Sequence, residues 1–195
     1  MKKRNIIRSQ KVLINYFKDS SLRMKKNTVI SFQDNIKLGS NILFEGKIIL
    51  GKNNKIHSNC ILKNVILGDN NLIKMSSYIE NTNIKNNNLI GPFAYLRDNT
   101  KINNNCIIAA YVEVTRSLIN NKTFISHRAF IGDASIGHNT IIGAGVVFCN
   151  YNFKTNSKAR STVGKNCKIG SNSTIIAPAH IMPSTIIPAA TKFKN

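Results

Sequence analysis

A six-residue spacing of large apolar side chains runs through most of this chain. In residues 118–151 the spacing is six with a single step of five, and its members are Ile119, Ile125, Ile131, Ile136, Ile142 and Phe148. This period matches neither the 3.6-residue turn of a helix nor the two-residue alternation of a long strand. A fixed six-residue period is typical of a parallel β-helix built from hexapeptide repeats. We therefore expect an all-β solenoid.

The same spacing continues on both sides of this segment. Its other members are Leu38, Phe44, Leu50, Ile56, Leu62, Leu67, Ile73, Ile79, Ile84, Ile90, Leu96, Ile102, Ile108, Val114, Val163, Ile169, Ile175, Ile181 and Ile187. We call the whole set the ladder. Its side chains are expected to stack inside a triangular coil of roughly 18 residues, because each coil is stable only when a neighbouring coil covers it.

Gly and Asn recur at fixed places after the ladder residues. The glycines that directly follow a ladder residue are Gly39, Gly51, Gly68, Gly91, Gly132, Gly137, Gly143, Gly164 and Gly170. Asparagines recur two residues further on, at Asn41, Asn53, Asn70, Asn105, Asn139, Asn166 and Asn172. Both residue types tolerate the left-handed backbone conformation that tight corners demand. We expect them at the corners of the coils.

Two segments depart from the repeat. Residues 6–18 predict one short α-helix that caps an open end of the solenoid. Its apolar face would carry Ile6, Val12, Leu13, Tyr16 and Phe17. We assign residues 1–35 to this helix and a connector, and residues 36–195 to the β-helix. The ladder spacing widens between Phe148 and Val163, which predicts an excursion loop over residues 150–162, a place where binding function tends to lie.

The net charge and the apolar stretches of the sequence limit which partners the protein can have. The chain has 28 Lys and Arg against 8 Asp and Glu, a formal charge of +20. Such a surface could bind nucleic acid. Because the chain also holds 29 Asn and many Ile and Lys, we attribute the charge to A/T-rich codons and predict no nucleic-acid partner. No apolar stretch resembles a signal peptide or could span a bilayer, so we expect a cytoplasmic protein without a membrane partner.

The four cysteines form no CxxC pair, which argues against a zinc site or a redox motif. Cys60, Cys106 and Cys167 each lie four residues after a ladder residue. Since a free cysteine behaves as a small apolar side chain, we expect these three inside the solenoid. No metal site is predicted.

Two side chains offer candidate chemistry. His127 comes two residues after Ile125, so we expect it on the wall of the solenoid. An imidazole, with an ordinary pKa of about 6.5, could act there as a general base. Arg97 could bind a phosphate through its planar guanidinium. Taken alone, each is more often a structural residue than a functional one.

Five segments resemble one family. They are GPFAYLR (91–97), YVEV (111–114), SHRAFIGDASIG (126–137), IGAGVVFCNY (142–151) and IGSNSTIIAPA (169–179). They resemble the C-terminal left-handed β-helix domain of GlmU, the bifunctional glucosamine-1-phosphate acetyltransferase and N-acetylglucosamine-1-phosphate uridyltransferase. The resemblance implies a left-handed coil and a homotrimer with active sites between subunits. It also implies acetyl transfer from acetyl-CoA, without a metal, to the amine of glucosamine 1-phosphate. The product would supply UDP-N-acetylglucosamine for peptidoglycan and lipopolysaccharide synthesis.

The resemblance also implies roles for individual residues. His127 stands at the position of the catalytic base, and Arg97 and Lys158 stand at positions that bind the sugar phosphate. Backbone N–H groups near Ala144 would face the oxyanion of the tetrahedral intermediate. The positions that line acetyl-CoA are Ala144, Asn150, Tyr151, Ser171 and Ala189.

The acceptor positions differ from the family pattern. Thr115, Phe130 and Ile141 stand where the family has Lys, Tyr and Asn. Arg116 follows Thr115 directly, but neighbouring residues of a strand point to opposite faces, which argues against Arg116 replacing the missing lysine. The uridylyltransferase domain is absent from this sequence, so we do not expect that reaction from it.

Three alternatives to this function stay open. The first is an acetyltransferase of the same kind with a different amine acceptor. The second is a catalytically decayed remnant retained as a trimeric scaffold. The third is nucleic-acid binding through the basic surface, which would weaken steeply with salt.

Overall fold

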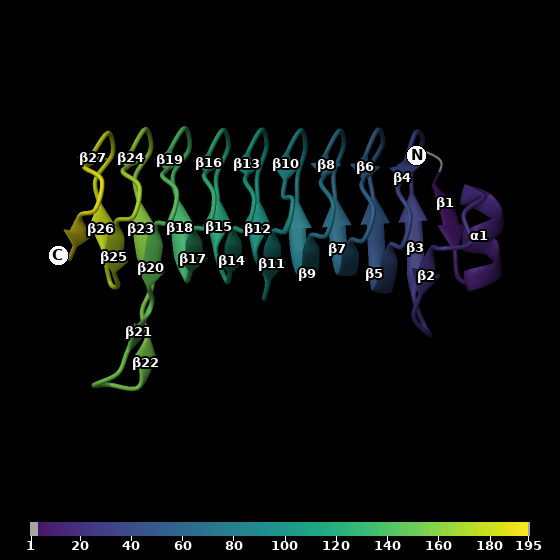
Figure 1. Ribbon diagram of the computed structural model, residues 1–195, viewed down its shortest axis with the longest axis horizontal. Coiled ribbons are helices and arrows are strands. Elements are labelled where there is room, and N and C mark those ends of the chain that lie inside the picture. Colours follow the sequence, from purple (N-terminus) through teal and green to yellow (C-terminus); the bar gives the residue numbers. More distant parts are fainter. Residues whose placement is uncertain (1–3, 195) are drawn as a thin grey trace.

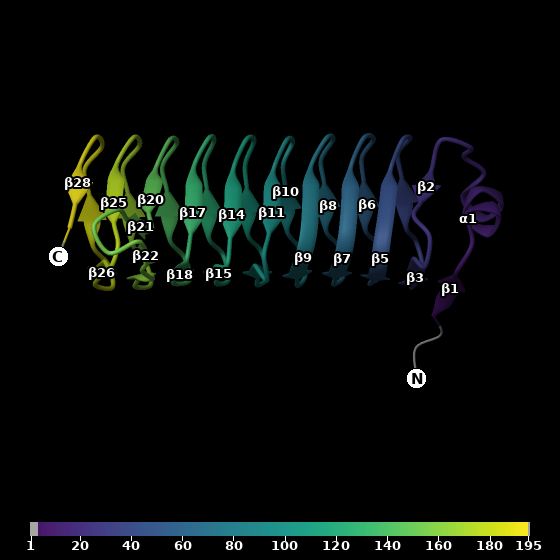
Figure 2. The ribbon, with the colours of Figure 1, turned by 90° about the horizontal axis from the view of Figure 1, so that it is seen from below.

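Short strands stack in parallel along one axis and form a solenoid, with one helix at its N-terminal end (Figures 1 and 2). The computed structural model describes residues 4–194. Each coil has three walls, which we number in the order the chain visits them. Corner 1 joins walls 1 and 2, corner 2 joins walls 2 and 3, and corner 3 leads to wall 1 of the next coil.

Wall 1 is a nine-stranded sheet of two-residue strands. These strands are β4 (Lys37–Leu38), β6 (Lys55–Ile56), β8 (Leu72–Ile73), β10 (Leu89–Ile90), β13 (Ile107–Ile108), β16 (Phe124–Ile125), β19 (Ile141–Ile142), β24 (Lys168–Ile169) and β27 (Ile186–Ile187).

Walls 2 and 3 belong to one larger sheet. Three long strands bend through both walls: β5 (Leu43–Leu50), β7 (Ile61–Leu67) and β9 (Tyr78–Ile84). The other strands of wall 2 are β2 (Arg23–Met24), β11 (Tyr95–Arg97), β14 (Glu113–Thr115), β17 (Phe130–Gly132), β20 (Val147–Cys149), β25 (Thr174–Ile176) and β28 (Lys192–Phe193). The other strands of wall 3 are β3 (Val29–Phe32), β12 (Lys101–Ile102), β15 (Leu118–Ile119), β18 (Ala134–Ile136), β23 (Ser161–Val163) and β26 (His180–Ile181).

The ladder forms the core, as its spacing predicts. Successive coils place one ladder residue on the next, for example Ile108 on Ile125 and Ile125 on Ile142. Every ladder residue is buried except Leu38, which packs half-buried against the core. Cys60, Cys106 and Cys167 are buried with them, so the prediction for these three is confirmed. The protein is a left-handed parallel β-helix of hexapeptide repeats, and burial of this continuous apolar stack stabilises it.

The corners confirm the role predicted for asparagine and correct the one predicted for glycine. All seven corner asparagines have φ between 56° and 60°, in the left-handed region. Among the nine glycines, only Gly91 has a positive φ, of 86°. At most of the others a Cβ would meet the backbone of the next coil. It would lie 2.4 Å from the Gly164 carbonyl carbon at Gly137, and 2.3 Å from the Ala189 nitrogen at Gly170. Close approach of coils, rather than φ, requires glycine there.

Gly137→Ala is therefore expected to destabilise the protein by about 1–3 kcal/mol, because the added methyl group must push two coils apart. Chemical denaturation followed by circular dichroism measures this loss. Lys85 holds the same corner position in another coil, where its N–H donates to Ile102 as that of Gly137 donates to Val163. Lys85→Ala is the matched control and should change stability little. An equal loss in both variants would contradict the close-approach explanation.

The N-terminal cap differs from its prediction. The helix α1 covers only Gln10–Phe17, because the extended Ser9 caps it with a hydrogen bond from the Val12 N–H to the Ser9 hydroxyl. The preceding strand β1 (Asn5–Ile7) pairs antiparallel with β3. The predicted helix over residues 6–18 was thus too long. Its face was also partly wrong: Leu13 is buried and Phe17 packs on the core, but Ile6, Val12 and Tyr16 are about half exposed.

The two irregular segments have structure of their own. The predicted connector contains β2 and β3, which already pair in parallel with β5. Residues 150–160, where the ladder spacing widens, leave corner 2 and form an antiparallel hairpin of β21 (Tyr151–Asn152) and β22 (Ser157–Lys158). This hairpin projects from the solenoid at the lower left of Figure 1. Within residues 4–194, no helix is long and apolar enough to cross a membrane.

Candidate active site

His127 lies at corner 1, in the turn of residues 126–129 between β16 and β17. Strand β16 ends at Ile125, and the chain turns at once through Arg128, whose φ is 58°. The prediction that His127 sits on a wall is therefore wrong. Its side chain is exposed, and within residues 4–194 no group hydrogen-bonds to the imidazole. Both ring nitrogens are available to a ligand.

Backbone hydrogen bonds stack corner 1 of successive coils in register. The Gly145 N–H donates to the His127 carbonyl, the Asn172 N–H to that of Ala144, and the Ala190 N–H to that of Ser171, each at 2.8 Å. His127, Ala144, Ser171 and Ala189 thus hold equivalent positions in four successive coils. Parallel strands lie about 4.8 Å apart, so these residues form one continuous column. The proposed base and three of the five proposed acetyl-CoA positions lie together.

The backbone around Ala144 offers one free donor. The Gly143 N–H donates to Ile169, and the Gly145 N–H donates to His127, both at 2.8 Å. Within residues 4–194, the Ala144 N–H donates to no protein group. Of the N–H groups expected to face an oxyanion in this segment, the one that remains available is therefore that of Ala144, in the coil that follows His127.

The acceptor positions are divided between two walls. Arg97 pairs in register with Thr115 on wall 2, and Phe130 lies one coil further along the same wall. Ile141 lies on the outer face of wall 1, with 43% of its surface exposed. Thr115 is fully buried, and its hydroxyl hydrogen-bonds to the side chains of Asp98 and Arg116 at corner 2.

The remaining predicted residues lie at the far end of wall 2. Asn150 is at corner 2, where its side-chain amide donates to Asp133. Tyr151 and Lys158 face each other across the exposed hairpin. Within one subunit, wall 2 separates these three residues from His127. A single chain does not bring all the predicted site residues together.

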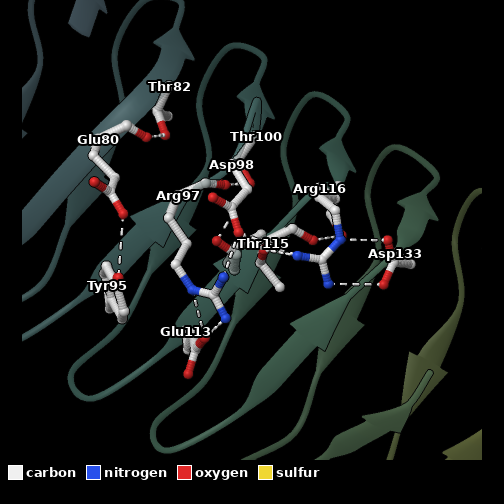
Figure 3. Close-up of polar contacts among 12 residues, drawn as sticks. Glu80, Thr82, Tyr95, Arg97, Asp98, Thr100, Glu113, Thr115, Arg116 and Asp133 are labelled. Atoms are coloured by element: carbon white, nitrogen blue, oxygen red, sulfur yellow. Dashed lines mark hydrogen bonds and ion pairs between the residues drawn. The ribbon is translucent and has the colours of Figure 1, made fainter. Parts of the chain in front are cut away.

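Sequence reasoning named Arg97 and Arg116 but missed the acidic side chains that pair with them at and beside corner 2 (Figure 3). We call Arg97, Asp98, Glu113, Arg116 and Asp133 the corner-2 ion cluster. Arg97 donates to Glu113 Oε1 from Nε at 3.0 Å and from Nη2 at 2.7 Å, and it also pairs with Asp98. Arg116 donates to both oxygens of Asp133, from Nε at 2.7 Å and from Nη2 at 2.9 Å. The sequence did carry one signal for this cluster. Oppositely charged residues recur at a separation of one coil, which is 17 residues for Arg116 and Asp133.

The two aspartates of the cluster, Asp98 and Asp133, are held in their charged form. Burial pushes the pKa of Asp98 upward, but the hydrogen bond from Thr115 and the charges of Arg97 and Arg116 outweigh it and lower that pKa. The pKa of Asp133 is also lowered, because hydrogen bonds from Arg116 and Asn150 outweigh burial. The hydrogen bond to Asp133 raises the pKa of Arg116. At neutral pH the two aspartates are therefore ionised beside the two guanidinium groups.

The repeats and the fold define a class, the left-handed β-helices built from hexapeptide repeats. The family "Bacterial transferase hexapeptide (six repeats)" matches residues 81–116. Within residues 4–194, no group of three or more His, Cys, Asp or Glu side chains could hold a metal ion.

Among known proteins, the chain is similar to bifunctional protein GlmU. It is 39% identical to GlmU of Ruthia magnifica over 163 residues, which is 84% of this chain and 36% of that protein. It is 40% identical to GlmU of Baumannia cicadellinicola over 158 residues, 81% of this chain and 33% of that protein. The resemblance indicated by the sequence motifs is confirmed, and the chain spans about a third of the length of these relatives. A solved structure of Francisella novicida UDP-N-acetylglucosamine acyltransferase matches 80% of this chain and 59% of its own, with a TM-score of 0.49 and 19% identity.

Proposed function

We propose that this protein transfers an acetyl group from acetyl-CoA to the amine of glucosamine 1-phosphate. The observation that carries this proposal is the column at corner 1. An exposed imidazole and the Ala144 N–H, neither of which has a hydrogen-bond partner among residues 4–194, lie in adjacent coils of a chain that is 39–40% identical to proteins named GlmU over about four fifths of its length. These are the two groups that acyl transfer to an amine requires: a base for the amine proton and a donor for the oxyanion.

In the proposed reaction the amine nitrogen attacks the thioester carbon, and His127 takes the proton that the nitrogen loses. The C–N bond forms, and the carbonyl oxygen becomes an oxyanion that accepts a hydrogen bond from the Ala144 N–H. The intermediate then collapses, the C–S bond breaks, and the leaving thiolate takes the proton back from the imidazolium. The products are N-acetylglucosamine 1-phosphate and free CoA. A neutral imidazole accepts a proton through its unprotonated ring nitrogen, which suits His127 to the first proton transfer.

The column suggests how acetyl-CoA would lie. Beyond His127 its members are Ala144, Ser171 and Ala189, all with small side chains, so an extended thioester arm could follow the corner closely. Asn150, Tyr151 and Lys158 are too far along wall 2 to join this arm in one subunit. We propose that they reach the site of a neighbouring copy in a homotrimer.

An apolar stripe on wall 1 supports the homotrimer. We call this set the wall-1 stripe; its members pair in register on five successive coils and are Leu72, Leu89, Ile107, Phe124 and Ile141. Ile107 and Ile141 are 42% and 43% exposed. Lys55 and Lys168 bound the stripe at its two ends. Contiguous exposed apolar surface marks an interaction site. Packing of wall 1 against another wall of a neighbouring copy would bring corner 1 to the interface between the two copies.

The direct test is release of free CoA thiol from acetyl-CoA in the presence of glucosamine 1-phosphate, with the acetylated sugar identified by mass spectrometry. The expected result is stoichiometric formation of both products. Because Phe130 and Ile141 replace polar residues of the family, a panel of other amino sugars and amines tests a shifted acceptor in the same assay. Absence of release with every amine, together with absence of acetyl-CoA binding by calorimetry, would overturn the proposal in favour of a scaffold.

A further inference from the structure

One carboxylate oxygen in the corner-2 ion cluster is shared by two guanidinium groups (Figure 3). Asp98 Oδ2 pairs with Nη1 of Arg97, and it accepts from Nη1 of Arg116 at 3.1 Å. The Thr115 hydroxyl lies 3.0 Å from the same oxygen. A single anionic oxygen therefore sits where two cations and a hydroxyl converge. Phosphate oxygens are commonly held by donors of this kind.

Arg116 reaches this point because it has left the strand. Strand β14 ends at Thr115, and Arg116 has a φ of 49° at corner 2. The alternation of faces along a strand therefore does not apply to it, and the sequence argument against Arg116 was wrong. Its Nη1 lies 2.9 Å from Thr115 Oγ1. Arg116 thus brings a positive charge beside Thr115, which stands at the lysine position of the family that the sequence resembles.

Each guanidinium also has an anchor that does not involve Asp98. Glu113 holds Arg97 through Nε and Nη2, and Asp133 holds Arg116 through Nε and Nη2. Both Nη1 groups would therefore keep their positions if the Asp98 carboxylate moved away. Such preorganisation of donors lowers the cost of binding an anion.

Further cations surround the cluster and could help to bind an incoming anion. A hollow of about 390 Å³ opens beside Asp98 and Arg116 and is also lined by Lys101 and Arg160. Arg160 is held by the carbonyl oxygens of Arg116 and Ala134, at 3.2 and 3.1 Å, and no carboxylate among residues 4–194 pairs with it. The charge of Lys158 acts on Asp133 from the hairpin. Adding Lys101, Lys158 and Arg160 to the cluster gives five cations and three carboxylates, a balance that matches a phosphate dianion.

The family resemblance already implies a phosphate role for Arg97. We propose that Arg116 completes a phosphate clamp with it, and that Asp98 is an internal carboxylate that fills the clamp until a phosphate displaces it. Asp98 then sets specificity, because a dianion competes with it for both guanidinium groups and an uncharged sugar does not. The inference rests on the proposed function only for its choice of glucosamine 1-phosphate as the ligand.

The test is calorimetric binding of glucosamine 1-phosphate and of glucosamine to the full chain, without acetyl-CoA. The parent protein is expected to bind the phosphorylated sugar more tightly. Arg116→Ala should weaken that binding about tenfold or more, since a charge-assisted contact is lost, and leave glucosamine binding unchanged. Asp98→Asn should strengthen binding of the phosphorylated sugar several-fold, because the competing charge is gone.

Lys63→Ala is the matched control. It removes a cation from an ion pair with Glu45 on wall 2, at 3.3 Å, without touching the clamp. Thermal unfolding of each variant verifies the fold, and Asp98→Asn keeps the test decisive if Arg116→Ala does not fold.

The clamp is refuted if the parent shows no preference for the phosphorylated sugar, if a folded Arg116→Ala binds it as tightly as the parent, or if Asp98→Asn binds it more weakly. Binding preference without acetyl transfer would leave the clamp standing and remove the proposed function. Acetyl transfer without that binding preference would refute the clamp and leave the proposed function standing.

Discussion

Replacing His127 by Ala is expected to lower kcat/KM for acetyl transfer by about 10²- to 10⁴-fold, the usual contribution of a positioned general base. The amine would then have to lose its proton to water while it attacks the thioester. Measurement of CoA thiol release with saturating acetyl-CoA gives this ratio directly. Acetyl-CoA affinity, measured by calorimetry, should change little, because the imidazole is exposed and makes no bond that holds the corner.

His138 provides a matched control for this variant. It is an exposed histidine in a corner of the same coil as His127, and its carbonyl accepts the Asn166 N–H as the His127 carbonyl accepts the Gly145 N–H. It lies at corner 3, across the coil from the proposed site. His138→Ala should keep the activity of the parent. If both variants were equally active, His127 would not be the base.

The fold was predictable because one physical requirement repeats along the chain. Each coil must bury one apolar side chain per wall, so positions such as Ile125 and Ile142 read directly from the spacing. The left-handed asparagines at the corners followed from the same register. The glycines were correctly predicted to lie at the corners, but the expected reason, a left-handed backbone, was wrong for most of them. At Gly137 the distance to the next coil decides, and that distance is not visible in a local pattern.

The N-terminal cap and the direction of the Arg116 side chain were harder to predict from the sequence, each for its own physical reason. Strand β1 exists because it pairs with β3, about 25 residues away, and such pairing overrides a weak helical pattern. The direction of Arg116 depends on where β14 ends. A strand rule applied one residue too far points the side chain to the wrong face. The position of His127 was misjudged in the same way, since β16 has only two residues.

Phe124→Glu is expected to convert the proposed homotrimer to monomers and to abolish acetyl transfer. Phe124 is in the wall-1 stripe and pairs with Ile107 on one side and Ile141 on the other. In the trimer a glutamate here would bury an unpaired charge against apolar neighbours at each of three interfaces, at a cost of several kcal/mol. In the monomer the same side chain points to water, so the solenoid itself should remain folded. Light scattering coupled to gel filtration should then give the 21.7 kDa mass of one chain, against three times that mass for the parent.

The expected loss of activity in Phe124→Glu has a different physical cause from the expected dissociation into monomers. Asn150, Tyr151 and Lys158 lie at the far end of wall 2 from His127, so a monomer lacks one side of the proposed site. Ile66→Glu is the control, because Ile66 is a 41% exposed apolar residue on wall 3, outside the wall-1 stripe. It should leave both the mass and the rate of CoA release unchanged. A monomeric Phe124→Glu variant with full activity would show that each chain carries a complete site, and the shared-site arrangement would have to be given up.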